Sequence, residues 1–362
     1  MKSFPKRWAA LSSIAALALV ATACGNDANG GGSGDTEGLS GTIAGAGSSA
    51  QGAAQEAWIA GFTGEAPDVT VTYDPIGSGG GRDQFTSGGT DFGGSDAYLD
   101  DEEIAAANET CGGGFVEFPA YISPIAIAYN LPGIDTLNLS PSVIAMIFDA
   151  KITTWNDPAI KELNPDADLP STTITAVHRS DESGTTENFA DYLSKAAPDD
   201  WTYEVSGDWP TKGGEAAPQT QGVAQALNAG EGTIGYIDAS QAGDLGVAAV
   251  QVGEEFVAYS PEAASKAVDE ATPVDGRPEH SYAIDLPRDT TETGVYPIVL
   301  VSYQLACLSY DTEAKADMVK AYFHYLVSED GQELAAEHAG SAPISDEFRK
   351  TAEESIDTIS AG

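Results

Sequence analysis

The nine residues HRSDESGTT, residues 178–186, are the most informative segment of the chain, and they join a strand-like run to a helix-like run. The preceding residues 174–177 read ITAV, which suits a strand, and residues 187–193 read ENFADYL, which suits a helix. The turn between them carries an arginine, a glycine and several hydroxyl side chains. Exposed N–H groups at a helix start attract anions, and a guanidinium adds a planar fork suited to phosphate or carboxylate. We therefore predict an anion-binding turn centred on Arg179.

The composition makes this arginine more informative. The chain has 362 residues, of which 42% are hydrophobic and 20% charged, so it is globular and long enough for two lobes. Its formal net charge is -40, from 16 basic and 56 acidic residues. This excess argues against a nucleic-acid partner, which needs clustered Lys and Arg, and against binding of the folded part to an anionic membrane surface. We read the acidity mainly as a source of solubility.

The first residues predict export. Residues 1–23 combine three basic residues near the start with an apolar run, residues 8–20, that is too short to span a bilayer. Residues 21–24, ATAC, resemble a bacterial lipobox, in which the cysteine is lipidated. We expect Cys24 to anchor the protein to the outer face of the cell membrane. The alternative is an ordinary signal peptide that is cut after Ala23.

Beyond the lipobox the chain predicts a tether and then an α/β domain. Residues 24–38 are rich in glycine and polar residues without an apolar pattern, as in a flexible tether. From residue 40 onward strand-like and helix-like runs alternate, which is typical of α/β layers. Residues 238–297 show no clear pattern. The four histidines have no partners at metal-ligand spacing, so we expect neither a metal nor another cofactor.

If Cys24 is lipidated, two cysteines remain, Cys111 and Cys307. In an oxidising compartment two such thiols commonly pair, so we predict a disulfide between them. The alternative is a pair of buried free thiols.

Two further segments share the layout of the opening turn. Residues 45–50, GAGSSA, and residues 76–81, IGSGGG, each follow a strand-like run and precede a helix-like run. Each would present N–H groups and a hydroxyl at a helix start. A single serine in this position is most often only a helix cap. Three such turns favour a shared anion site if the fold brings them together.

Asp96, in DFGGSD at residues 91–96, adds a carboxylate to this set. A carboxylate can only accept hydrogen bonds, so it suits an anion that still carries a proton. Phosphate keeps a proton near neutral pH and sulfate keeps none, so Asp96 would reject sulfate through an unpaired, repulsive contact. The alternative is that Asp96 is a turn residue or the cap of the helix expected at residues 101–108.

Together these elements give the chain a resemblance to a known family. It resembles the phosphate-binding lipoproteins and periplasmic proteins that serve the phosphate-specific ABC importer, the PstS family. The similarity covers most of residues 40–350 and includes DAKITTWNDP at residues 149–158, LNP at residues 163–165 and GTIGYI at residues 232–237.

The resemblance implies a two-lobed periplasmic-binding-protein fold of type II, an α/β fold with mixed sheets flanked by helices and the ligand in the cleft. We expect lobe I to comprise residues 39–122 plus 300–362, and lobe II residues 123–299. The hinges are expected near residues 118–124 and 296–302, since such proteins close by hinge motion about their ligand.

The resemblance also implies the binding residues. From lobe I the expected phosphate contacts are Ser49, the backbone of Ala50, Ser78 and Asp96, and from lobe II they are Arg179, Ser183, Gly184 and Thr185. Asp181 is expected to orient Arg179 through an ion pair. Relatives often carry a bulky aromatic residue where this chain has Ala50, a change that a backbone contact would survive.

The expected function is therefore capture of inorganic phosphate outside the membrane and delivery to the permease subunits of an ABC importer, by a monomer that is not an enzyme. One alternative is a binder of another oxyanion such as sulfate, against which Asp96 argues. A remote alternative is a phosphate-ester hydrolase with Ser183 as nucleophile, although the sequence has no Gly-x-Ser-x-Gly elbow and no metal cluster. A sensor or surface antigen that also binds phosphate is the third.

Overall fold

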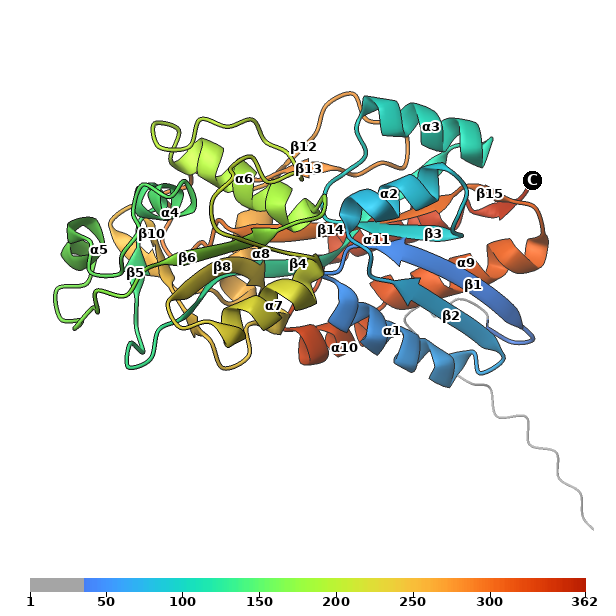
Figure 1. Ribbon diagram of the computed structural model, residues 1–362. Coiled ribbons are helices and arrows are strands. Elements are labelled where there is room, and N and C mark those ends of the chain that lie inside the picture. Colours follow the sequence, from blue (N-terminus) through green and yellow to red (C-terminus); the bar gives the residue numbers. More distant parts are fainter. Residues whose placement is uncertain (1–35) are drawn as a thin grey trace, which may run out of the picture. The chain divides into compact units, whose positions relative to one another are not determined.

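A computed structural model describes residues 36–362 of the chain (Figure 1). The predicted signal peptide, the lipidation site Cys24 and most of the predicted tether lie outside the described residues. The described residues belong to one compact unit in which helices and strands alternate, so the predicted α/β class is confirmed. None of the helices in this part of the chain is both long and apolar enough to cross a bilayer.

One large mixed sheet organises the fold. Its strand order is β2-β1-β3-β14-β4-β8-β6-β7, and β9 pairs with β4 outside this path. β1 is parallel to β2 and β3, and β14 is antiparallel to β3 and β4. The bounds are β1 Gly41–Gly47, β2 Val69–Asp74, β3 Phe92–Ser95, β4 Phe115–Asn130, β6 Thr175–Arg179, β7 Glu215–Ala217, β8 Thr233–Asp238, β9 Gly246–Val247 and β14 Val299–Cys307.

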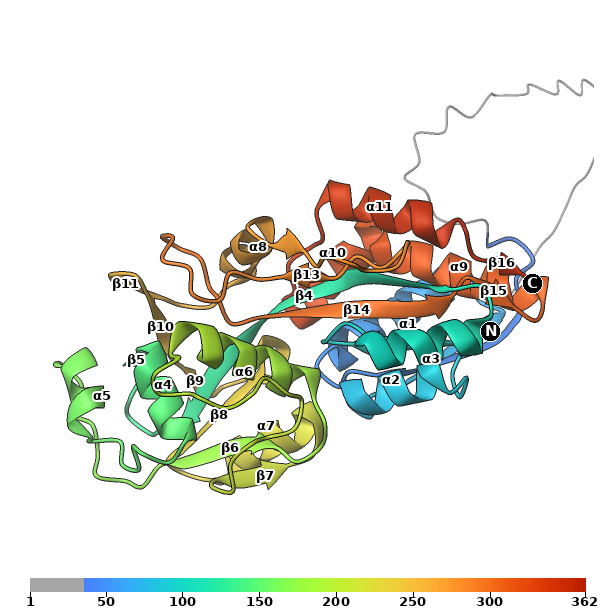
Figure 2. The same cartoon turned by 90° about the horizontal axis from the view of Figure 1, so that it is seen from above.

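The long strand β4 connects the two ends of this sheet. Its first part pairs with β14 and its last six residues pair with β8, so one strand takes part in both regions (Figure 2). Fifteen of its 16 residues are buried. The strand contains Pro119 and Pro124, although proline usually interrupts central strands. The structure accommodates Pro119 at an irregularity in the pairing with β14, opposite the step from Ser302 to Tyr303.

Helices cover the faces of the sheet, and most of them start at a side-chain cap. Ser183 caps α6, and Asp100 forms a reciprocal capping box with Glu103 at the start of α3. The helices are α1 Gly52–Glu65, α2 Ser78–Thr86, α3 Asp101–Cys111, α4 Pro141–Phe148, α5 Pro158–Leu163, α6 Gly184–Ala196, α7 Gln219–Ala229, α8 Pro261–Asp269, α9 Glu313–Val327, α10 Glu329–Ala339 and α11 Asp346–Ile356.

The remaining strands are short and form small separate sheets. β11, β10 and β5 form one of them, while β12 pairs with β13 and β15 with β16. Their bounds are β5 Asn138–Leu139, β10 Ala249–Val252, β11 Glu255–Val257, β12 Thr272–Pro273, β13 Ile284–Asp285, β15 Ser309–Tyr310 and β16 Ser360–Ala361.

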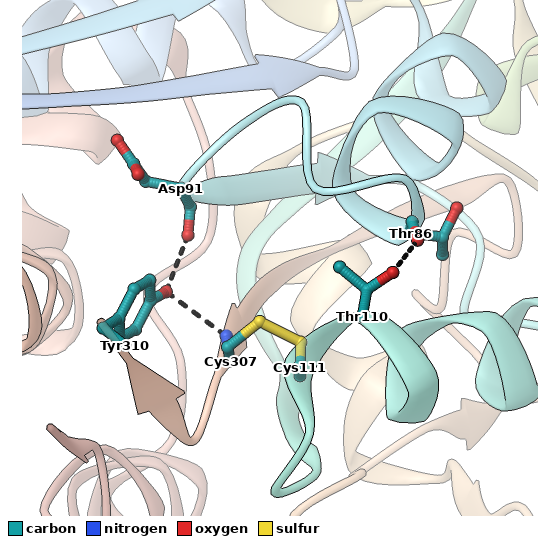
Figure 3. Close-up of a disulfide and its surroundings, with 6 residues drawn as sticks. All are labelled: Thr86, Asp91, Thr110, Cys111, Cys307 and Tyr310. Atoms are coloured by element: carbon teal, nitrogen blue, oxygen red, sulfur yellow. Dashed lines mark hydrogen bonds between the residues drawn. A yellow bond between two sulfur atoms is a disulfide. The ribbon is translucent and has the colours of Figure 1, made fainter. Parts of the chain in front are cut away.

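A disulfide joins Cys111, the last residue of α3, to Cys307 at the end of β14, so the predicted pairing is confirmed (Figure 3). Beside it the hydroxyl of Tyr310 accepts a hydrogen bond from the N–H of Cys307 at 3.2 Å and donates to the carbonyl of Asp91 at 2.6 Å. The bridge therefore ties α3 to the central part of the sheet across 196 residues of sequence.

Replacing both Cys111 and Cys307 by serine is expected to lower the free energy of unfolding by about 2–4 kcal/mol, because the unfolded chain regains the freedom that the cross-link removes. Urea unfolding followed by circular dichroism measures this loss. Dithiothreitol should destabilise the wild type and leave the double variant unchanged. Equal midpoints for oxidised wild type and double variant would contradict the prediction.

Candidate anion-binding site

The three predicted turns all lead into helices. Residues 45–50 precede α1, residues 76–81 enclose the start of α2, and residues 178–186 run from β6 into α6. Gly77, just before α2, has a positive φ of 101°, and a Cβ there would lie 2.8 Å from a carboxylate oxygen of Asp181. Only glycine suits both the backbone and the space at this position.

The starts of α2 and α6 lie against each other and against Asp96. A Cβ built on Gly184 would come within 2.6 Å of the Asp96 Cβ and 2.8 Å of the Ser78 Oγ. Ser78 Oγ in turn accepts a hydrogen bond from the N–H of Asp96 at 3.1 Å. The absence of a side chain at Gly184 therefore allows a close approach between segments that are far apart in the sequence.

Asp96 is a buried carboxylate surrounded by hydroxyl donors, with 3% of its surface exposed. Ser302 donates to its Oδ1 at 2.7 Å and Thr185 donates to its Oδ2 at 3.2 Å. Burial raises the pKa of Asp96 above its ordinary value, while hydrogen bonds from Ser48 and Ser302 and the charge of Arg179 oppose the rise. The alternative role of Asp96 as the cap of α3 is wrong, because Asp100 holds that position.

Arg179, at the end of β6, forms a two-pronged ion pair with Asp181. Its Nε lies 2.9 Å from Oδ1 of Asp181 and its terminal nitrogen 2.5 Å from Oδ2. Asp181 also accepts the N–H of Gln219, which has a strained positive φ of 59°. Burial acts to raise the pKa of Asp181, but the hydrogen bonds and charge of Arg179 lower it overall. Arg179 is only 3% exposed, so its orientation is fixed.

Ser49 brings the start of a fourth helix, α7, to the site. Its Oγ lies 3.0 Å from the Oγ1 of Thr220 and accepts the N–H of Thr220 at 3.0 Å. The N–H of the neighbouring Ala50 donates to the Oγ of Ser48 at 3.1 Å. Ser49 and Ala50, two of the four lobe I contacts predicted for the ligand, thus have partners within the protein in this structure.

All eight residues of the predicted shell are buried, and Asp181 is partly exposed. The sequence missed several polar residues at the site, chiefly because their contacts come from distant segments. Ser48 is adjacent to Ser49, a predicted contact residue, so the GAGSSA segment could have indicated it. Nothing in the neighbouring sequence indicated Thr220 or Ser302.

Arg82 of α2 is a further residue near the site that was not predicted from the sequence. Its guanidinium contacts Glu103 at 2.7 Å, Ser95 at 3.0 Å and, from the opening turn, Glu182 at 2.5 Å. In the first turn of α6, burial raises the pKa of Glu187 to about 7, against the lowering effect of the nearby Arg82 charge. Arg82 therefore connects α2 to residues 178–186 at the border of the site.

Asp96 also lines a cavity of about 530 Å³. Asn188, Lys195 and Arg288 contribute to its walls, but Ser49, Ser78 and Arg179 do not. It is therefore distinct from the place where the three helix starts meet. Within residues 36–362, no three or more His, Cys, Asp or Glu side chains gather closely enough to hold a metal ion.

Known proteins resemble this chain over nearly its full length. A family model described as a PBP superfamily domain matches residues 33–330. Phosphate-binding protein PstS3 of Mycobacterium bovis is 35% identical over 370 residues, covering 97% of this chain and 98% of that protein. Phosphate-binding protein PstS2 of the same organism is 34% identical over 377 residues, covering 99% and 100%.

Solved structures show the same fold at lower identity. A high-affinity periplasmic phosphate-binding protein with bound phosphate, PfluDING, is 20% identical with a TM-score of 0.71 over 87% of this chain and 93% of that chain. A putative phosphate ABC transporter substrate-binding protein from Clostridium perfringens, also 20% identical, has a TM-score of 0.59 over 84% and 100%. The predicted periplasmic-binding-protein fold is confirmed.

Proposed function

The chain belongs to the PstS family of phosphate-binding proteins, and from this premise we propose that it captures inorganic phosphate outside the membrane and delivers it to the permease subunits of an ABC importer. Capture and delivery without covalent chemistry fit a transport protein rather than an enzyme.

One observation carries the choice of ligand, namely the buried Asp96 carboxylate beside Arg179 and the helix starts. Arginine and free N–H groups favour any oxyanion. The carboxylate adds a requirement, because it repels an anion that has no hydrogen to donate. Phosphate satisfies this requirement near neutral pH and sulfate does not.

We assign the phosphate shell to the residues that meet at this point. Arg179 supplies the charged fork, already oriented by Asp181, and Asp96 accepts the phosphate proton. The first N–H groups of a helix have no acceptor within the helix, so those that no capping side chain accepts are available to the ligand. The further contacts are Ser49, the backbone of Ala50, Ser78, Ser183, Gly184 and Thr185.

Phosphate has to replace internal contacts on the lobe I side. The Oγ of Ser49 is bonded to Thr220, and the N–H of Ala50 is bonded to Ser48. We propose that the arriving anion takes over these hydrogen bonds. Exchange of one partner for another costs less than desolvation of a free polar group, so internal partners are compatible with binding.

Closure of two lobes about hinges is the proposed mechanism. The expected hinge segments, residues 118–124 and 296–302, fall in or beside the paired strands β4 and β14. Contacts between the proposed lobes include Arg82 with Glu182 and Asp96 with Thr185. These contacts favour a state in which the lobes meet around the anion.

We further propose that the protein works as a monomer, held at the outer face of the cell membrane by a lipid on Cys24. The lipobox-like residues 21–24 and the glycine-rich stretch behind them support this anchoring. Metabolic labelling with a radioactive fatty acid tests it directly, because Cys24→Ser would abolish labelling.

Titration calorimetry of the purified mature protein tests the proposed function. We expect phosphate to bind one to one with micromolar or tighter affinity, about 8 kcal/mol or more. Sulfate should bind at least a hundredfold more weakly, and an alkylphosphonate at near-neutral pH should compete weakly with phosphate.

Two results would overturn the proposal. Binding of sulfate in preference to phosphate would favour the alternative of another oxyanion. Release of phosphate from a chromogenic ester by the purified protein would favour the hydrolase with Ser183 as nucleophile.

A further inference from the structure

We propose that a buried chain of hydrogen bonds, running from Tyr322 to Asp96, holds the Asp96 carboxylate as a pure acceptor and so sets the selectivity for protonated anions. The chain, called the relay below, comprises Tyr322, Gln55, Gln51, Ser302 and Asp96. The proposal rests on the proposed phosphate site and adds four side chains of lobe I, Ser302 of β14 among them, that lie outside the proposed phosphate shell.

The relay is continuous. Tyr322 of α9 donates to Oε1 of Gln55 at 2.8 Å, and Nε2 of Gln55 donates to Oε1 of Gln51 at 2.6 Å. Nε2 of Gln51 then donates to the Oγ of Ser302 at 2.5 Å, and Ser302 donates to Oδ1 of Asp96 at 2.7 Å. Every member is buried, with at most 3% of its surface exposed.

The direction of the relay is fixed at its far end. Burial raises the pKa of Tyr322 well above its ordinary value, so the phenol stays protonated and donates its single hydrogen. Gln55 therefore turns its oxygen to Tyr322 and its NH₂ group to Gln51. Gln304 also donates to Oε1 of Gln51, at 2.8 Å. With two donors on its oxygen, Gln51 presents its NH₂ group to Ser302.

Ser302 accepts a hydrogen bond from Gln51 and donates one to Asp96. Because its oxygen accepts from Gln51, its own hydrogen is available for Oδ1 of Asp96. The other oxygen, Oδ2, receives a hydrogen bond from Thr185 at 3.2 Å. A protonated Asp96 would direct a hydrogen at one of these donors, so the relay disfavours that form. An ionised Asp96 accepts only, and a bound anion must then supply the hydrogen.

Other groups around Asp96 also affect its protonation equilibrium. Burial raises the pKa of Asp96, and the charge of Arg179 on β6 lowers it. Tyr73 of β2 lies close enough for Asp96 to raise its pKa, and Glu187 of α6 lines the same cavity wall as Asp96. Ser48 adds a hydrogen bond that also lowers the pKa of Asp96, and Ser302 differs from it in being the donor to Oδ1 that the relay orients.

Two variants interrupt the relay in different ways. Ser302→Ala removes the donor to Asp96. Gln51→Glu keeps the bonds from Gln55 and Gln304 but replaces the NH₂ group by an acceptor, which draws the Ser302 hydrogen away from Asp96. The matched control is Ser355→Ala, which removes another buried serine hydroxyl, in α11, with no bond to the relay.

The measurement is the ratio of phosphate to sulfate affinity between pH 4.5 and pH 8, by competition titration on the full mature chain, with thermal unfolding as the check on folding. Both relay variants are expected to prefer phosphate at pH 8 and to lose this preference at a pH about one unit higher than the wild type, because the lost hydrogen bond to the charged form raises the pKa of Asp96. Ser355→Ala should follow the wild type.

The outcomes separate the two proposals. A merely structural role for the relay would lower the unfolding temperature without moving the pH at which selectivity is lost. A wild-type pH profile in both folded relay variants overturns the relay alone. A wild type that binds no phosphate overturns the proposed function and the relay with it.

Discussion

Replacing Arg179 by alanine is expected to weaken phosphate binding by about 2–5 kcal/mol, or about thirty- to several-thousand-fold, at near-neutral pH. The guanidinium is 3% exposed and its orientation is fixed by Asp181, so it contributes both charge and a directed donor pair at a buried position. Its loss also leaves the Asp181 carboxylate beside the incoming anion without a cation. Both effects weaken binding, and calorimetry at constant ionic strength measures their sum.

Two control variants show whether the weaker binding comes from loss of the charge or from loss of the guanidinium geometry. Arg179→Lys keeps the charge and loses the planar fork, so an intermediate affinity is expected. Lys350→Ala removes one positive charge from a side chain that is 77% exposed, and it should leave the affinity unchanged. Near-normal phosphate binding by Arg179→Ala would show that the anion binds elsewhere.

The secondary structure around the anion-binding turn depends on local signals. The strand, turn and helix around residues 178–186 follow from neighbouring residues, since a run of apolar residues, a capping serine and a glycine each act within a few positions. The disulfide was predictable from the export signal and the count of cysteines.

The contacts that the sequence does not predict join residues that are far apart along the chain. Ser49 meets Thr220 across 171 residues and Gln51 meets Ser302 across 251 residues, so no local pattern pairs them. Alternation along a strand indicates that Ser302 faces one side of the sheet but does not identify the partner on that side. Residues 238–297 were not predicted for a different reason, because apart from α8 they form short strands, one turn of 3-10 helix and loops.

The strong acidity of the chain is compatible with this site. The proposed shell uses one guanidinium and otherwise uncharged N–H and O–H donors, which act at contact distance and are buried. The field of the remaining charges acts over the solvent, where salt screens it, and changes the rate of encounter more than the contact energy.

Replacing Asp96 by asparagine is expected to reduce the preference for phosphate over sulfate by about two to three orders of magnitude, or about 3–4 kcal/mol. Asparagine has nearly the shape of aspartate, and its oxygen can still accept from Ser302. Its NH₂ group can donate to an anion oxygen that carries no hydrogen, and the repulsion of sulfate disappears. Phosphate loses the acceptor for its proton. The affinity for phosphate should therefore fall while the affinity for sulfate rises.

The pH dependence gives this variant a second signature. Asparagine does not titrate, so the affinity ratio of Asp96→Asn should stay flat over the range in which the wild type loses its preference on acidification. Asp100→Asn makes the same chemical change at the cap of α3, where asparagine caps as well as aspartate, and it should keep the wild-type ratio. An unchanged ratio in Asp96→Asn would mean that selectivity comes from the number and placement of donors, and the carboxylate would then serve only to join Ser302 and Thr185 across the site.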